Sequence, residues 1–442
     1  MLDAAHDTIA AIATPPGVGG IGVVRISGPK AGAIAAAIVE RTLTPRRATV
    51  TNFLDANGTT IDTGIGLLFL GPASFTGEDV LELQGHGGSV VLDMLLERAL
   101  ALGARTARAG EFTERAFLNQ KLDLAQAEAV ADLIEAASEQ AARLAQRSLA
   151  GHFSKHVHAL TESIIELRAF VEAGIDFPDE EIDLLENEDI GLRLDGIAQR
   201  LRDTLSAAAQ GRLLREGIRC VLMGPPNVGK SSLLNGLVGH ERAIVTDIPG
   251  TTRDTVDESV LIDGVRVTFT DTAGVHDAGD RVEQEGIART HRAAAEADVV
   301  LLVDDANGPQ SPYQSAPDAR PSLRVWNKVD LLETVPENGG HDVYVSARTG
   351  VGLSALGEKI VATLGIEPGG EGLFMARRRH IEALSAANEG IENAKDIFEQ
   401  RLGIELIAEE LRQAARSLAS ITGEFTTEDL LAEIFSRFCI GK

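Results

Sequence analysis

The sequence predicts a multidomain fold, in which an α+β domain is followed by an α-helical domain that contains an inserted α/β domain. Three observations lead to this prediction. Residues 1–118 mix short apolar stretches with glycine-rich turns, and residues 119–215 form alanine-rich stretches with few glycines. Residues 216–372 alternate strand-like and helix-like stretches, which is typical of a mostly parallel sheet, and helical character returns over residues 373–442.

The first segment is predicted to hold four strands and one helix. The strands are Thr8–Ala13, Gly22–Ser27, Ile65–Leu70 and Val80–Gln84, and the helix lies near Ser89–Leu102. Each strand is a short apolar run with Gly, Pro or Asp close to its ends, which is the pattern of strands separated by turns. This segment is therefore predicted to be α+β.

A glycine run in the same segment, Gly17–Gly22, formally matches the dinucleotide-binding pattern G-x-G-x-x-G. That pattern must open a helix, whereas here Pro15 and Pro16 precede it and a predicted strand follows it. We interpret the run as a flexible turn and reject a dinucleotide site.

The later segments alternate between helical and mixed character. Residues 119–215 are predicted to form helices that include Leu124–Leu149 and His156–Glu172. The strands of residues 216–372 are Ile218–Met223, Val265–Asp271, Val299–Asp304, Leu323–Asn327 and Val343–Ser346. After a glycine-rich linker, helical character resumes at Ala376. Because helical sequence lies on both sides of residues 216–372, we interpret this segment as an insertion into the helical domain.

The charge balance limits the kinds of partner. The 442 residues include 41 Lys and Arg against 66 Asp and Glu, which gives a net charge of −25. Phosphate backbones are bound mainly through Lys and Arg, so this balance argues against a wide RNA-binding surface. Any contact with RNA is expected to be local, or to come through a more basic partner.

The composition also indicates a compartment. Two cysteines, Cys220 and Cys439, are too few for a disulfide scaffold and fit a reducing environment. No apolar run reaches the ~20 residues that a membrane-spanning helix requires, and the acidic start of the chain lacks signal-peptide character. We therefore expect a cytoplasmic protein with no membrane association.

A complete phosphate-binding loop, of the pattern G-x-x-x-x-G-K-[ST], lies at Gly224–Ser231. In such a loop the glycines let backbone N–H groups surround the phosphates, Lys230 reaches the terminal oxygens, and the Ser231 hydroxyl can ligate Mg²⁺. By itself the loop predicts only that a nucleoside triphosphate binds.

The base is predicted by Asn327-Lys328-Val329-Asp330, about a hundred residues further on. The Asp330 carboxylate can accept hydrogen bonds from both the ring N–H and the exocyclic amine of guanine, a pair that adenine does not offer. Charge-assisted bonds of this kind contribute roughly 1.5–3 kcal/mol each. Guanine is therefore the expected base.

Further elements complete the order expected of a Ras-like P-loop GTPase. Thr251 and Thr252 lie in a polar loop from which a hydroxyl can reach the metal, and Asp271–Gly274 end an apolar strand near the γ-phosphate. Ser346–Arg348 close another strand and can cover the base. The predicted GTP-binding residues are Asn227, Val228, Gly229, Lys230, Ser231, Ser232, Thr246, Thr251, Thr252, Asp271, Thr272, Ala273, Gly274, Asn327, Lys328, Asp330, Ser346, Ala347 and Arg348.

Hydrolysis needs a substitute for the glutamine that many GTPases use to orient the attacking water, because Val275 follows Gly274 here. Glu283, in a polar segment, can hold the water. Asn227 beside the phosphates can instead help to bind a monovalent cation. Such a cation would supply the positive charge that an arginine finger provides elsewhere, an effect of order 10³–10⁵ in rate.

Three other features have alternative interpretations. Cys220 enters the phosphate-binding loop on a strand and is predicted to be a small buried residue. Cys439 belongs to the terminal Cys439-Ile440-Gly441-Lys442, which either packs structurally or brings a cysteine and a lysine to a site elsewhere. The basic run Arg377–His380 is either a solvated helix start or a contact for RNA or a partner.

The chain resembles the bacterial tRNA-modification GTPase family MnmE, also called TrmE, over its whole length. The stretches that carry the resemblance, besides the guanine-nucleotide set, are Ala13–Gly17, Ser74–Gly88, Gly110–Phe117, Lys121–Glu128 and Cys439–Lys442. The resemblance implies an N-terminal domain, residues 1–118, that binds 5-formyl- or 5,10-methylene-tetrahydrofolate and forms a homodimer. It also implies a helical domain of residues 119–215 and 373–442, with a potassium-dependent GTPase domain, residues 216–372, inserted in it.

Proteins of this family act on tRNA with an FAD- and NADH-using partner, MnmG, in a heterotetramer. The resemblance implies that the two proteins together install an aminomethyl-type or carboxymethylaminomethyl group at carbon 5 of the wobble uridine, with folate as the one-carbon donor. The acidic charge of this chain agrees with a partner that provides much of the tRNA binding.

By matching motifs, the resemblance also implies site residues. The folate contacts would be Arg25, Glu82, Lys121 and Lys442. The cations suit glutamyl carboxylates, and Glu82 suits pterin N–H donors. The implied metal ligands are Ser231 and Thr252 for Mg²⁺, and Asn227, Thr246, Ile248 and Thr251 for K⁺. The catalytic residues would be Glu283 and Lys230, together with the terminal Cys439.

Three functions compete on the sequence alone. The first is a GTP-driven subunit of a tRNA-modifying enzyme. The second is a pure switch GTPase, which explains residues 216–372 but neither the separate N-terminal domain nor the terminal Cys439–Lys442. The third is a folate-dependent transferase that its GTPase domain merely regulates. Folate binding separates the second from the others, and blocking GTP hydrolysis separates the first from the third.

Overall fold

The structure is a computed structural model that describes residues 7–176, 188–240, 242–243, 257–270, 293–309, 320–366, 373–424, 427–436 and 438–441. Contacts divide the chain into two compact units. Unit 1 consists of Met1–Ala131, Leu149–Arg168 and Arg412–Lys442, and unit 2 of Asp132–Ser148 and Ala169–Leu411. The predicted domain boundaries at residues 118, 215 and 372 stay predictions.

In the described part of unit 1, six strands form a sheet in the order β3-β4-β5-β2-β1-β6. They are β1 (Ile9–Ile12), β2 (Gly19–Ser27), β3 (Thr49–Leu54), β4 (Thr60–Phe69), β5 (Val80–Gly87) and β6 (Arg105–Thr106). All four predicted strands are confirmed. The prediction missed β3, whose Thr-Val-Thr-Asn start is largely polar, and β6, which is only two residues long. Because β2 begins inside Gly17–Gly22, the run leads into a strand, and the rejection of a dinucleotide site holds.

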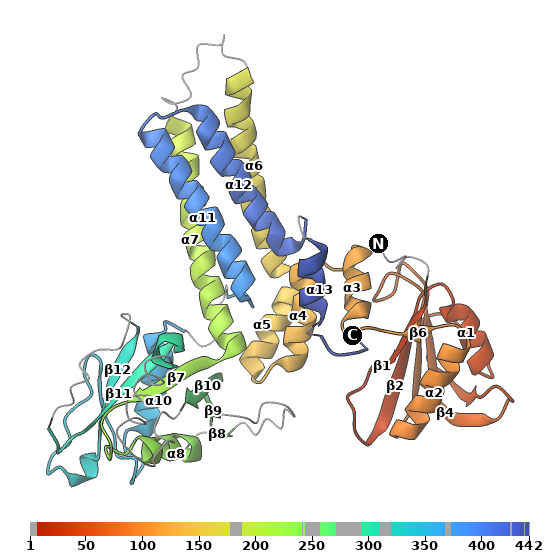
Figure 1. Cartoon of the computed structure of the whole chain (residues 1–442), viewed down its shortest axis with the longest axis horizontal. Coiled ribbons are helices and arrows are strands. Elements are labelled where there is room, and N and C mark those ends of the chain that lie inside the picture. Colours follow the sequence, from red (N-terminus) through yellow and green to blue (C-terminus); the bar gives the residue numbers. More distant parts are fainter. Residues whose placement is uncertain are drawn as a thin grey trace, which may run out of the picture. The chain divides into compact units, whose positions relative to one another are not determined.

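Helices cover this sheet and close its core (Figure 1). Residues of α1 (Ala31–Ile38) and α2 (Ser89–Ala101) pack into one buried cluster with Ala10 of β1. A second cluster joins Ile9 and Ala11 of β1 with Phe112 of α3 (Glu111–Leu118). Successive side chains of a strand point to opposite faces, so both faces of β1 are buried. The helix near Ser89–Leu102 is confirmed, whereas α1 and α3 were not predicted.

Further helices lie in segments whose described residues contain no strand. They are α4 (Leu124–Glu135), α5 (Glu139–Leu149), α6 (His152–Asp176), α7 (Glu188–Glu216), α11 (Arg378–Glu399), α12 (Ile404–Thr422) and α13 (Glu428–Ser436). Within unit 2, α7 runs beside α11 (Figure 1). Across the described ranges, none of the helices combines the length and the apolar composition that crossing a bilayer requires.

One helix prediction is wrong in its extent. The stretch Leu124–Leu149 forms two helices, α4 and α5, because residues 136–138 are not helical. The Ser138 hydroxyl accepts a hydrogen bond from the backbone N–H of Ala141 at 3.2 Å, which is how a serine caps the start of a helix. The favourable cap at Ser138 starts a new helix within a sequence whose alanine content suits a continuous one.

The basic run Arg377–His380 is a helix start, as predicted, but of its four residues only Arg378 is exposed, so the predicted solvation holds for that residue alone. Helix α11 begins at Arg378, and Arg377 donates a hydrogen bond to the Asp132 carboxylate at 2.7 Å. His380 is 2% exposed, and its ring accepts a hydrogen bond from the backbone N–H of Arg377. These two side chains are held within unit 2, so the run is not a free basic patch.

In unit 2, seven described strands form a sheet in the order β13-β12-β11-β7-β10-β9-β8. They are β7 (Ile218–Met223), β8 (Arg242–Ala243), β9 (Asp257–Ile262), β10 (Val265–Thr270), β11 (Val299–Asp305), β12 (Ser322–Asn327) and β13 (Asp342–Tyr344). The neighbours from β13 to β10 are parallel, and β9 pairs antiparallel with β10. All five predicted strands are found, although β13 ends at Tyr344, two residues before the predicted end at Ser346, and Asp271 lies outside the described residues. The predicted mostly parallel sheet gains an antiparallel edge.

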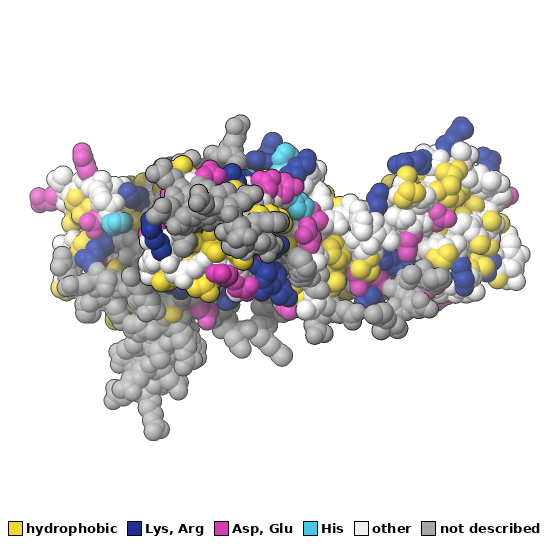
Figure 2. Space-filling model, turned by 90° about the horizontal axis from the view of Figure 1, so that it is seen from above, with side chains coloured by type: hydrophobic (Ala, Val, Ile, Leu, Met, Phe, Trp, Pro, Cys, Tyr) yellow, Lys and Arg dark blue, Asp and Glu magenta, His cyan; other side chains and the backbone are white. Residues whose placement is uncertain are grey.

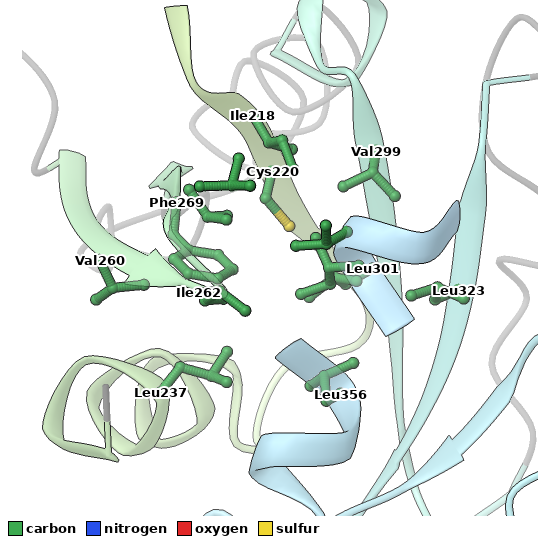
Figure 3. Packing of buried hydrophobic residues seen from close by; sticks show 14 of the residues in the cluster. Ile218, Cys220, Leu237, Val260, Ile262, Phe269, Val299, Leu301, Leu323 and Leu356 are labelled. Atoms are coloured by element: carbon green, nitrogen blue, oxygen red, sulfur yellow. The ribbon is translucent and has the colours of Figure 1, made fainter. Parts of the chain in front are cut away.

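The core of this sheet is apolar on both faces. One cluster gathers Leu237 of α8 (Lys230–His240) and Leu356 of α10 (Leu353–Thr363) against the strands, as Figure 3 shows. The opposite face packs Val221 and Met223 of β7 against Ala294 and Ala297. Cys220 lies in the first cluster (Figure 3), fully buried, and burial raises the pKa of its thiol. Its predicted role as a small buried residue is confirmed.

Candidate functional site

The phosphate-binding loop joins β7 to α8 at the carboxyl end of the sheet. Two of its glycines have backbone angles that suit no other residue, with φ of +156° at Gly224 and +92° at Gly229. A Cβ at Gly224 would collide with the carbonyl oxygen of Val303, and one at Gly229 would lie 2.5 Å from the Asn327 amide nitrogen. The glycines therefore let the loop pack closely against the next strands.

The loop has one apolar side chain that packs into the core of the sheet and several polar side chains that are exposed. Val228 is 6% exposed and belongs to the core of the sheet, whereas Asn227, Ser231 and Ser232 are exposed. Lys230 Nζ donates to the carbonyl oxygens of Gly224 and Pro225, both at 2.8 Å. An ammonium group held over this loop can exchange such carbonyls for phosphate oxygens, so the loop fits a triphosphate.

The predicted base-recognition residues lie against this loop. Asn327 is 2% exposed, and its amide donates to the carbonyl oxygen of Val228 at 2.9 Å. Its side-chain oxygen accepts from the backbone N–H of Ala347 at 3.0 Å. Asn327 thus ties three segments, separated by about a hundred and by twenty residues, into one site.

Asp330 and Ser346 meet at the base end of the site. The Ser346 hydroxyl donates to Asp330 Oδ1 at 2.6 Å, and it accepts from the backbone N–H of Thr349. Ser346 is fully buried, whereas Asp330 and Arg348 are exposed. One carboxylate oxygen is therefore oriented by the protein, while the carboxylate remains accessible to the N–H groups of a guanine.

Sequence reasoning missed Asp305. Lys328 has a left-handed backbone, with φ of +66°, and its Nζ donates to Asp305 Oδ2 at 2.7 Å and to the carbonyl oxygen of Asn227 at 2.8 Å. The hydrogen bond from Lys328 holds the pKa of the Asp305 carboxyl below its usual value. The signal was the position of Asp305 at the carboxyl end of a strand beside β7, where side chains of neighbouring parallel strands converge.

Several predicted site residues lie outside the described residues. They are Thr246, Ile248, Thr251, Thr252, Asp271, Thr272, Ala273, Gly274, Glu283 and Lys442. The predicted Mg²⁺ and K⁺ sites are therefore represented by Ser231 and Asn227 alone. Asn227 has φ of +64°, and asparagine accepts this conformation better than most residues.

A second polar site lies in unit 1. Arg25 on β2 and Glu82 on β5 are cross-strand neighbours, and they form an ion pair with N–O distances of 2.9 and 3.0 Å. The rings of Phe75 and Phe112 lie 5.7 and 5.8 Å from the Arg25 guanidinium carbon. A half-buried cation and carboxylate beside aromatic rings fit a flat heteroaromatic ligand that carries N–H donors and carboxylates.

The end of the chain reaches this second site. Arg25 donates to the carbonyl oxygen of Gly441 at 3.4 Å, and Ile440 forms a β-bridge with Ala109. Cys439 is exposed, and its carbonyl oxygen accepts from the backbone N–H of Gly110. Lys121 donates instead to the carbonyl oxygen of Pro72 at 2.9 Å. Of the predicted folate contacts, the structure thus brings together Arg25 and Glu82, with Gly441 beside Arg25.

The sheet, the phosphate-binding loop and the Asn327–Asp330 segment define a P-loop GTPase, a GTP hydrolase, joined to a helical domain and an α+β domain. Residues 124–439 match the family described as the MnmE helical domain, and residues 8–121 match the one described as the GTP-binding protein TrmE N-terminus. The chain belongs to the MnmE family. This confirms the resemblance and the predicted fold class.

Relatives match over their full length. The tRNA modification GTPase MnmE of Methylococcus capsulatus is 52% identical over 445 residues, which cover 99% of each chain. The protein of the same name from Pseudomonas aeruginosa is 54% identical over 455 residues and 100% of each chain. The solved structure of Aquifex aeolicus Era bound to GDP·AlF4− is 26% identical and covers 39% of this chain and 66% of that one. Its TM-score of 0.27 is too low to carry a structural argument.

Proposed function

We propose that the chain is the GTP-hydrolysing subunit of an enzyme that modifies carbon 5 of the wobble uridine in certain tRNAs. The observation that carries this proposal is the full-length similarity to proteins named tRNA modification GTPase, at 52% and 54% identity. The added group would be of the aminomethyl or carboxymethylaminomethyl type, and a tetrahydrofolate derivative, 5-formyl or 5,10-methylene, would supply its carbon.

On the GTP side, each described residue has a separate task. Asp330, oriented by Ser346, accepts the guanine N–H groups, and Asn327 holds the base loop against the phosphate loop. Lys230 neutralises terminal phosphate oxygens. Mg²⁺, held by Ser231 and Thr252, would neutralise charge on the phosphates.

Hydrolysis would depend on a second cation. We assign K⁺ to Asn227, Thr246, Ile248 and Thr251, and the positioning of the attacking water to Glu283. The carbonyl oxygen of Asn227 accepts from Lys328, which fixes the backbone of Asn227 beside the phosphate loop. A residue fixed in this way suits a cation ligand, because little reorganisation is needed on binding.

On the folate side, Arg25 is suited to a glutamyl carboxylate and Glu82 to pterin N–H donors. In the structure the two bind each other, so a ligand must compete for or bridge this pair. Lys121 and Lys442 would add positive charge, and Cys439 lies in the terminal segment next to Arg25. We further propose that the chain forms a homodimer in the cytoplasm. This homodimer would bind an FAD- and NADH-dependent MnmG-like partner to form a heterotetramer.

Complementation of a strain that lacks this chain tests the proposal. The wild type should restore the modified wobble uridine, measured by mass spectrometry of tRNA nucleosides, and Glu283→Ala should not. If Glu283→Ala restores it while hydrolysis is abolished, the chain is a folate-dependent transferase that GTP merely regulates. If the nucleosides are the same with and without the chain, the protein is a switch GTPase and the proposal fails.

A further inference from the structure

Within the segment between α1 and β3, residues 41–48 carry three arginines, and we name these eight residues the arginine loop. Every residue of the loop is exposed except Leu43, which is 7% exposed and packs in the core of the sheet. Arg41, Arg46 and Arg47 therefore stand on the surface within seven positions of one another. Dark blue side chains stand out from the surface of this domain at the right of Figure 2.

None of these three guanidinium groups forms an ion pair or a side-chain hydrogen bond with another residue in the described ranges of the chain. Other arginines of unit 1 behave differently, since Arg105 and Arg115 each bind carboxylates. Even Glu40, the nearest acid in sequence, accepts its hydrogen bond from Asn52. In a chain with 66 acidic residues against 41 basic ones, a cluster of uncompensated arginines needs an explanation.

The backbone of the loop indicates that the Arg46 side chain matters. The backbone N–H of Arg47 donates to the carbonyl oxygen of Thr44 at 3.1 Å, across Pro45 and Arg46. Arg46 has φ of +62°. These are the features of a type II turn, whose third position favours glycine or asparagine because other side chains are strained there. An arginine at that position strains the backbone, and strained residues occur more often at functional sites than elsewhere.

The loop is also anchored, so that its side chains project from a fixed frame. The backbone N–H of Arg46 donates to the carbonyl oxygen of Leu68 at 2.8 Å, and that of Arg41 donates to the Thr51 hydroxyl at 3.2 Å. Leu43 fixes the loop between these two points. A fixed frame lowers the conformational entropy lost on binding, so this loop is preorganised for a ligand.

We infer that the arginine loop binds the phosphate backbone of the tRNA on which the chain acts; the inference rests on the proposed function in naming this RNA. Guanidinium groups pair with phosphate oxygens in a bidentate way, and three of them match successive phosphates of a polyanion. The loop contains no aromatic residue that could stack on a base, so it contacts the backbone and not the sequence. A local basic contact is also what the acidic charge of the chain requires.

The test compares the full-length wild type with Arg46→Gly and with the triple variant Arg41→Gln, Arg46→Gly, Arg47→Gln. Glycine suits the positive φ of this turn, so Arg46→Gly removes the charge while it relieves the strain and preserves the fold. Binding to an unmodified tRNA transcript is measured by fluorescence anisotropy over a series of KCl concentrations. The slope of log K against log salt should fall by about 1 for Arg46→Gly and about 3 for the triple variant.

A matched control is Arg401→Gly. Arg401 is an exposed arginine with φ of +54° between α11 and α12, so the substitution and the charge loss are the same. Its tRNA affinity and salt slope should equal those of the wild type. All variants should hydrolyse GTP at the wild-type rate, because none alters the nucleotide site.

Three results would overturn the inference. They are an unchanged salt slope in the triple variant, an equal loss in Arg401→Gly, and a triple variant that keeps tRNA binding but loses an acidic protein partner in a pull-down. The last result would make the loop a protein-docking site. The proposed function fails separately, when tRNA nucleosides do not depend on the chain at all.

Discussion

Asn327 donates from its side-chain amide to the carbonyl oxygen of Val228, 2.9 Å away, and this bond holds the base-recognition loop against the phosphate-binding loop. The two residues are separated by 99 positions in the sequence. Both are buried, so the bond is shielded from water, and a buried amide left without its partner is costly. The same contact therefore fixes the predicted base-recognition residues and the phosphate-binding loop relative to each other.

Asp330→Asn should abolish the preference for guanine. An amide cannot accept both N–H groups of the base, so GTP should bind ~100-fold more weakly, which corresponds to the loss of one strong charge-assisted bond. Isothermal titration with GTP and XTP is the measurement, since the Asn amide can donate to the additional carbonyl of xanthine. The control, Ser346→Ala, removes the hydroxyl that orients Asp330 and should weaken GTP binding less. Unchanged GTP affinity in Asp330→Asn would contradict the base assignment.

GTP hydrolysis should be faster in KCl than in NaCl at the same ionic strength. A K⁺ ion beside Asn227 would supply charge to the phosphates that Na⁺, smaller and with shorter ligand distances, would not. We expect a difference of about tenfold or more, well within the range that an arginine finger provides. Phosphate release by the purified chain is the measurement. Asn227→Ala should lose the difference, and equal wild-type rates in the two salts would leave Glu283 or a partner as the source of catalysis.

Much of this architecture could be predicted, because the strands of the second sheet are short apolar runs that end at motif residues. Ile218–Met223 was predicted to the residue, and Asn327 was placed at a strand end. The helix break at Ser138 could not be foreseen, since a single capping hydroxyl outweighs a long run of good helix formers. Asp305 was missed because it forms part of no motif, and only the pairing of β11 with β12 brings it to Lys328.

The second polar site was less predictable. The family resemblance implies Arg25 and Glu82 as site residues, but their direct ion pair follows from a strand register that no local pattern encodes. A sequence gives the alternation of side chains along a strand, but not which residue of a distant strand lies opposite. The contact between Arg25 and Gly441 also cannot be predicted from local sequence, because it joins residues 416 positions apart.

Arg25→Ala should weaken the binding of 5-formyltetrahydrofolate about 10- to 100-fold without a change in GTP hydrolysis, because one charge-assisted contact is lost. Equilibrium dialysis with the full-length chain is the measurement. Arg25→Ala also leaves Glu82 without its cation, so Arg25→Lys serves as the control for charge, and it should bind folate better than the alanine variant. Equal folate affinity in all three proteins would remove Arg25 from the site.

The stability of unit 1 should fall in acid through Glu111. This carboxylate is 1% exposed, and burial by itself would raise its pKa. Hydrogen bonds from the Arg105 guanidinium and from the backbone N–H of Arg108, together with their charges, lower the pKa instead, to about 2 from 4.5. Because the folded state has the lower pKa, Glu111 stabilises the fold fully above pH 4.5, and this contribution of about 3 kcal/mol is lost as the pH falls toward 2.

Glu111→Gln isolates this effect from the other carboxylates. The variant should be less stable than the wild type at neutral pH, and the difference between the two should shrink as the pH falls below 4.5. The single tryptophan, Trp326, lies in unit 2, so its fluorescence does not report on unit 1. The stability of unit 1 is measured instead by amide hydrogen exchange of β1 and β2, corrected for the intrinsic exchange rate at each pH. A difference that stays constant from neutral pH to pH 2 would show that Glu111 contributes packing and hydrogen bonds but no charge.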